Sequence, residues 1–362
     1  MRMDGTANVL LNALRERFYY PDTGLVYDYS PGTPGRFPPT EQIHAAIPDP
    51  CGYGTGMEDC MLSGGTLLDA LVFLAERGGA AEIRGFASGI AGGMLRCAEA
   101  GRDGFLPRGL SPEDGASHYP DSSRDQYTLF VYGLWRYARS ELCGGNEKER
   151  IRAAFERIAD RAERNVTPET GFDLLREDGL PSRFTQMWGG ALGNHEVFRL
   201  PMIHLAAWDL SRRPARWETY LRYRDEALRR SLPVPACGRL YGLQQMACSL
   251  IPVLSLDPEG RDRAEEILRE IAAVARDMVP VLDEEIACLP PEAFRIRGHY
   301  ADFYRVQDAA IVPMLESMAP GVPVSPESAS LFRRTLARMD LQTHESALPA
   351  HFLNAYLRCE ET

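Results

Sequence analysis

The chain has 362 residues, 44% of them hydrophobic, and its formal net charge is −11 at pH 7. No basic run offsets this negative charge, which argues against a nucleic-acid partner. No apolar run reaches the roughly 20 residues that a membrane-spanning helix needs, which argues against a membrane protein.

Helical periodicity extends over most of the chain, and no useful length of β-branched residues alternates with polar ones as in a strand. Breakers mark several helix bounds: Gly78-Gly79 and Gly144-Gly145 follow two of the helices, and Pro214 begins another. The predicted helices cover residues 6–18, 58–78, 80–99, 123–141, 146–164, 188–211, 214–230, 239–255, 259–279, 301–318, 326–339 and 347–359.

Apolar and charged helices alternate along this series. The second and every second helix after it are nearly free of charge, as in the segment YTLFVYGLWRYA, whereas the intervening helices from residue 146 onward are rich in charge. A helix that is apolar all round is buried all round, and an amphipathic helix lies on the outside. The alternation therefore predicts an all-α fold with two concentric layers: an (α/α)6 barrel of six helical hairpins, formed by residues 1–362 as one domain.

The loops alternate in length as well. Most of the loops that precede an apolar helix are long and rich in glycine, proline and aromatic residues, whereas those that follow one are short. In an up-and-down ring, the long loops emerge on one face, above the N-termini of the inner helices. These termini present unpaired N–H groups and a positive dipole end, and functional residues concentrate on loops held by a rigid scaffold. We expect the functional site on this face.

Polar residues gather at the predicted starts of the apolar helices. The candidate catalytic carboxylates are Glu58, Asp59, Asp125 and Glu196. Capping of a helix start is the competing explanation for the first three, because short polar and acidic groups satisfy N–H donors there. The candidate substrate-binding residues are His118, Tyr119, Asp121, Arg124, Gln126, Trp188, His195, Tyr241, His299, Tyr300, Arg305 and His344.

The chain lacks the sequence signatures of several common sites. It contains no GK[ST] phosphate loop, no HExxH, no closed Cys–His zinc spacing and no GxSxG nucleophile elbow. We therefore expect no metal and no cofactor. The remaining set of carboxylates, histidines, arginines and aromatic residues suits sugar chemistry best.

Residues 124–130 (RDQYTLF) place an acid at the head of an apolar, aromatic helix. With the alternation of helices, this segment resembles the six-hairpin glycosidase superfamily, and within it the unsaturated glucuronyl and rhamnogalacturonyl hydrolases. The resemblance implies that Asp125 is the acid/base residue.

The predicted function is a glycoside hydrolase that acts on a short oligosaccharide, including one that contains an acidic sugar. Its carboxylate would pair with Arg124, Arg295, Arg297 or Arg305. Two alternatives stay open: a sugar epimerase or lyase that uses His195 and His299 as bases, and a non-catalytic sugar-binding toroid.

The sequence also predicts where the protein resides. The first twenty residues lack a continuous apolar stretch, so we expect neither a signal peptide nor a membrane anchor there. The eight cysteines include no CxxC pair, and several lie in apolar helical segments, as expected for reduced core thiols. We therefore expect a cytoplasmic enzyme.

Overall fold

The computed structural model describes residues 5–30, 33–236, 239–295 and 300–359. For Tyr300 it describes the backbone and not the side chain. Within these ranges helices predominate, and regular strand is limited to β1 (Tyr19–Tyr20) and β2 (Leu25–Val26), which pair antiparallel. The prediction of an all-α chain is confirmed.

Each predicted helix has a counterpart in the structure, and the bounds differ most at one of them. The predicted helix 188–211 begins only at Arg199. The preceding residues form turns because of their glycines, among them Gly189 with a φ of 101°. Two helices, α2 and α11, were not predicted; α11 begins at Val279 with a proline in its first turn, where proline is tolerated. The helices are α1 (Gly5–Arg17), α2 (Thr40–His44), α3 (Cys60–Leu74), α4 (Ala80–Ala100), α5 (Arg124–Ala138), α6 (Gly145–Asn165), α7 (Arg199–Ser211), α8 (Pro214–Arg230), α9 (Tyr241–Leu256), α10 (Arg261–Asp277), α11 (Val279–Ala287), α12 (Tyr300–Met318), α13 (Pro326–Arg338) and α14 (Pro349–Cys359).

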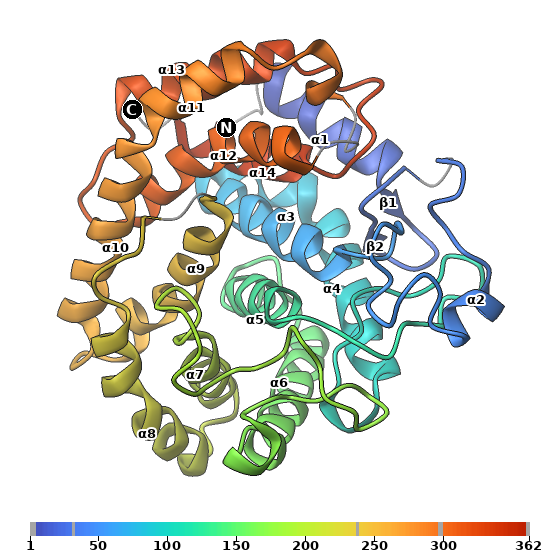
Figure 1. Ribbon diagram of the computed structural model, residues 1–362, viewed down its shortest axis with the longest axis vertical. Helices are drawn as coiled ribbons and strands as arrows, with labels where there is room; N and C mark the ends of the chain where they lie inside the picture. Colours follow the sequence, from blue (N-terminus) through green and yellow to red (C-terminus); the bar gives the residue numbers. More distant parts are fainter. Residues whose placement is uncertain (1–4, 31–32, 237–238, 296–299, 360–362) are drawn as a thin grey trace.

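The apolar helices pack on one another in a closed series. Helix α3 contacts α5, and the contacts continue from α5 to α7, α9, α12 and α14, which packs back against α3. The charged helices α6, α8, α10 and α13 lie outside this series, as Figure 1 shows. Burial follows the same division: 14 of the 15 residues of α3 are buried, against 5 of the 17 in α8.

Two glycines bring α3 and α5 into close contact. A Cβ atom on Gly65 would lie 2.1 Å from the carbonyl oxygen of Leu129, and one on Gly133 would lie 2.6 Å from the Cα of Gly65. Larger residues could not occupy either position without separating the helices. This contact therefore keeps the N-terminal ends of the two helices, and the acids there, near each other.

A buried ion network ties α3, α5 and α14 together further along their length. Asp69 accepts hydrogen bonds from Tyr132 and Arg136 of α5 and from Asn354 and Arg358 of α14. Burial alone would raise the pKa of Asp69, but the charges of the two arginines, Arg358 first, lower it below its ordinary value. Asp69 lies nine residues, or about 14 Å of helix, after the start of α3, so the network anchors the three helices away from their N-terminal ends.

Candidate active site

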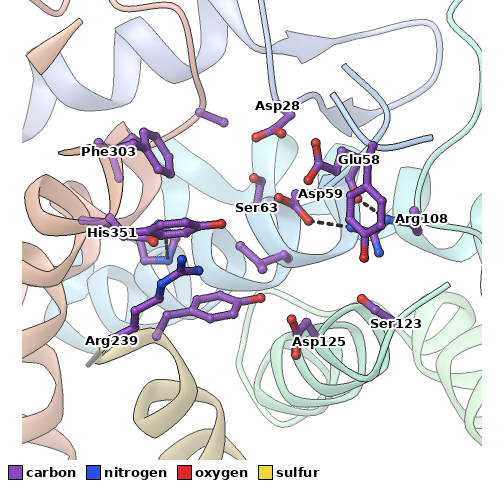
Figure 2. Close-up of a pocket in the computed structure, with 17 residues that line it drawn as sticks. Asp28, Glu58, Asp59, Ser63, Arg108, Ser123, Asp125, Arg239, Phe303 and His351 are labelled. Atoms are coloured by element: carbon purple, nitrogen blue, oxygen red, sulfur yellow. Dashed lines mark hydrogen bonds and ion pairs between the residues drawn. The ribbon is translucent and has the colours of Figure 1, made fainter. Parts of the chain in front are cut away.

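A cavity of about 210 Å³ lies where the N-terminal ends of α3, α5, α9, α12 and α14 meet. Figure 2 shows acidic side chains and Arg108 on one side of it and Phe303, His351 and Arg239 on the other. This is the face on which the loop pattern predicted a site. The lining residues are Asp28, Tyr53, Glu58, Asp59, Leu62, Ser63, Arg108, Ser123, Asp125, Arg239, Tyr241, Phe303, Tyr304, Gln307, Ala347, Leu348 and His351.

Arg108 holds the two acids before α3. Its Nε donates to the backbone carbonyl of Glu58 at 2.6 Å, and its Nη2 donates to Oδ1 of Asp59 at 3.1 Å. The guanidinium lies 4.9 Å from the ring centroid of Tyr53 and is almost fully buried. A buried, doubly bonded arginine has little freedom, so the positions of both acids are fixed.

Gln126 connects Asp59 to α5. Its Oε1 accepts hydrogen bonds from the backbone N–H groups of Met61 and Leu62, and its Nε2 donates to Oδ1 of Asp59 at 2.9 Å. Asp59 itself makes no side-chain cap bond to α3. The capping role that competed with a site role for Asp59 is thus taken by Gln126.

The pKa of Glu58 is shifted towards neutral pH. Burial, followed by the neighbouring charge of Asp59, raises its pKa to about 7, against the opposing effects of Arg108 and of the hydrogen bond from the Gly54 N–H. Burial also raises the pKa of Asp59, despite Arg108. A carboxyl with such a pKa can donate a proton to a substrate at neutral pH.

Asp125 has the opposite character. Its Oδ1 lies 2.5 Å from Nη1 of the buried Arg199, and Tyr241 hydrogen-bonds to the same carboxylate. Burial would raise its pKa, but Arg199, the Tyr241 hydrogen bond and then Arg124 bring it below the ordinary value. The carboxylate of Asp125 therefore stays ionised, because it pairs with Arg199, the first residue of α7.

The wall opposite the acids is aromatic and basic. The guanidinium of Arg239 lies 4.0 Å from the ring centroid of Tyr304, which packs edge-on against Phe303. Nε2 of His351 lies 3.3 Å from Nε2 of Gln307, and burial lowers the pKa of His351 to about 4. His351 is therefore a neutral imidazole at pH 7.

Of the predicted site residues, Glu58, Asp59, Asp125 and Tyr241 line the cavity, and Gln126 contacts one of them. Arg124 and Glu196 form an ion pair at 2.5 Å beside it. His195, next to Glu196, is half-buried, and burial lowers its pKa. Neither Glu196 nor His195 lines the cavity, because the segment before α7 is a loop and not the expected helix start.

Several other predicted residues have structural contacts away from the cavity. His118 pairs with Glu177 at 3.1 Å, and the hydroxyl of Tyr119 donates to the carbonyl of Ile47. Asp121 is buried and accepts a hydrogen bond from the N–H group of Ser122. Trp188 packs against Tyr223, and Arg305 pairs with Glu285. His344 is buried, and its Nδ1 lies 3.0 Å from the carbonyl oxygen of Ser346. Tyr300 begins α12, and His299 lies outside the described residues.

Asp28, Arg108 and His351 line the cavity but were not predicted from the sequence. Asp28 and Arg108 lie in loops, where no periodicity indicates which side chains point inward. His351 had a usable signal, because it is the one imidazole in the apolar segment ALPAHFLNAYL, near the start of a predicted inner helix.

In the part of the chain that the structure describes, no three His, Cys, Asp or Glu side chains are grouped to hold a metal ion, and no helix is long and apolar enough to cross a membrane. The cysteines within the described ranges are free thiols, and Cys237 lies outside those ranges.

Comparisons of the chain with protein-family models, with curated proteins and with solved structures find no match.

Proposed function

We propose that this protein is a glycoside hydrolase that acts on short oligosaccharides, with Glu58 as the general acid. The observation that carries the proposal is that two carboxyl groups on one cavity have pKa values shifted in opposite directions. Glu58 has its pKa raised to about 7, and Asp125 has its pKa lowered by Arg199 and Tyr241 against the effect of burial. Environments that separate the pKa values of paired acids are how glycosidases obtain an acid and a base from the same residue type.

In this mechanism Glu58 protonates the glycosidic oxygen as the bond to the anomeric carbon breaks. Asp125, held ionised by Arg199, stabilises the positive charge that develops on the sugar ring, and then activates water or bonds to the anomeric carbon. The anomeric configuration of the first product, read by proton NMR, distinguishes the last two routes. Arg108 and Gln126 act as positioning residues through Asp59.

The dimensions of the cavity favour a single sugar ring. Its volume of about 210 Å³ is below the roughly 300–1,000 Å³ of pockets for drug-sized ligands. The rings of Tyr53, Phe303 and Tyr304 line it and offer apolar faces to the C–H groups of a sugar. The substrate would therefore enter by its terminal residue, and the enzyme would release one monosaccharide at a time.

Arg239 is the residue that we assign to an acidic sugar. Of the four arginines suggested by the sequence, Arg124 and Arg305 are engaged with glutamates, Arg295 does not line the cavity, and Arg297 lies outside the described residues. Arg239 lines the cavity with an exposed side chain, stacked on Tyr304. A guanidinium supported in this way can pair with a carboxylate through two hydrogen bonds.

We also propose that the protein is an (α/α)6 barrel and that it is located in the cytoplasm. The closed series of contacts among α3, α5, α7, α9, α12 and α14 supports an (α/α)6 barrel, as in the six-hairpin glycosidases that the sequence resembles. Free thiols support a cytoplasmic enzyme that processes imported oligosaccharides, with no nucleic-acid or membrane partner.

Product analysis on a panel of neutral and uronate-containing oligosaccharides tests this function. Hydrolysis creates new reducing ends, a lyase creates unsaturated products that absorb ultraviolet light, and an epimerase or a binding protein creates neither. We expect new reducing ends. Arg239→Met should raise KM for uronate-terminated substrates more than for neutral ones, and absorbing products would overturn the proposal in favour of a lyase.

A further inference from the structure

A second cavity lies on the outer side of the molecule, between α6 and α8 and above α7. Its volume is about 280 Å³. Helices α6 and α8 both pack against α7, which forms the floor. The lining residues are Ala162, Glu163, Leu200, His204, Ala215, Glu218, Thr219, Arg222 and Tyr223.

His204 is the unusual residue of this cavity. Its side chain is 1% exposed, and its Nδ1 forms no hydrogen bond with any described residue. A buried polar atom without a partner destabilises the folded state, and an apolar residue of similar shape would avoid this cost. Burial, followed by the charges of Arg216 and Arg222, lowers the pKa of His204 to about 3. The imidazole is therefore neutral, and one nitrogen donates while the other accepts.

The remaining lining groups are mixed in sign and character. Glu163 is held by Nη1 of Arg216 at 2.8 Å and by the hydroxyl of Thr219 at 3.2 Å. Glu218 and Arg222 are exposed at the rim. Two carboxylates and one guanidinium line the cavity, so it has no excess of positive charge to hold an anion. Carboxylate acceptors, a guanidinium donor and a neutral imidazole together match hydroxyl groups, which donate and accept at once.

We propose that this cavity is a second ligand site, distinct from the one that holds Glu58, and that it binds a small neutral polyol such as a monosaccharide. One ligand hydroxyl bonds to His204 at the floor, and others bond to Glu163, Glu218 and Arg222 nearer the rim. The carbon atoms of Leu200 and Tyr223 contact the apolar face of the ring. This site does not depend on hydrolysis at the first cavity, because binding alone is required.

A titration followed by nitrogen–proton NMR of the histidine rings tests the site. The probes are glucose, galactose and xylose, added up to about 100 mM so that a dissociation constant in the millimolar range can be measured. His204→Phe identifies the His204 signals by their loss. We expect at least one sugar to shift these signals saturably, and Arg222→Ala to raise the dissociation constant for that shift at least about tenfold.

Arg229→Ala is the matched control, since Arg229 lies on the same helix and pairs with Glu226 away from the cavity. It should leave the dissociation constant unchanged. The absence of any saturable shift in the His204 signals would overturn the proposal. A shift with the same dissociation constant in wild type and Arg222→Ala would overturn it as well, because the ligand would then not be held by Arg222 in this cavity.

Discussion

Replacing Glu58 by glutamine removes the proposed proton donor and keeps the shape of the side chain. The Gly54 N–H donates to a carboxylate oxygen of Glu58 at 2.8 Å, and the amide oxygen of glutamine can accept the same bond. The fold should therefore survive. Turnover of an oligosaccharide should fall by about 10²–10⁴, the usual contribution of a general acid.

The raised pKa of Glu58 sets the size of the pH effect expected in the wild-type protein. With a pKa of about 7 instead of 4.5, Glu58 is protonated in half of the molecules at pH 7. An ordinary glutamate would be protonated in roughly one molecule in 300, so burial increases the active fraction roughly 150-fold. Above pH 7, kcat/KM should fall about tenfold per pH unit.

The assay compares two substrates of the same sugar, an oligosaccharide and an aryl glycoside, between about pH 5 and 9. A phenolate leaves without full protonation, so Glu58→Gln should impair the aryl glycoside less. Glu149→Gln, on the exposed surface of α6, is the control and should behave as wild type. Near-full turnover of the oligosaccharide by Glu58→Gln would refute the assignment of the acid.

Three further variants have defined outcomes. Asp125→Asn should keep its melting temperature within a few degrees and lose a factor of about 10² or more in kcat, and retained activity would remove Asp125 from the mechanism. Arg199→Met should raise the pKa of Asp125 and move the acidic limb of the kcat/KM profile to higher pH; an unmoved limb would show that another group titrates there. Asp308 is buried and its pKa is raised to about 7, so the folded state binds its proton more tightly than the unfolded state does. Stability should therefore fall between about pH 4 and 7 by a few kcal/mol, and Asp308→Asn, which still accepts from the N–H of Leu240, should flatten this part of the urea-unfolding profile.

The helices and their burial could be predicted from the sequence, because periodicity and charge report directly on which faces meet water. Glu58, Asp59, Asp125 and Tyr241 could be found because they stand at the starts of apolar helices. Which of these acids is protonated could not be predicted from their positions at helix starts. Arg199 decides the protonation of Asp125, yet the two are separated by 74 residues and meet only through the packing of α5 and α7.

The positions of residues in loops also could not be predicted from the sequence. Arg108 fixes Glu58 and Asp59 from a segment without regular structure, and nothing in its local sequence indicates that it is buried. In the segment before α7, residues were instead predicted to lie in the site that the structure places outside it. Its predicted helical start placed His195 and Glu196 in the site, whereas its glycines favour turns that leave both residues beside it.

The pKa of Glu58, on which its proposed role as the acid depends, can be measured directly. In protein labelled with carbon-13 at the glutamate carboxyl carbon, the Glu58 signal is identified by its loss in Glu58→Gln and followed through a pH titration. We expect a midpoint of about 7. A midpoint at the ordinary value of 4.5 would contradict it, because Glu58 would then be ionised at neutral pH and could not serve as the acid.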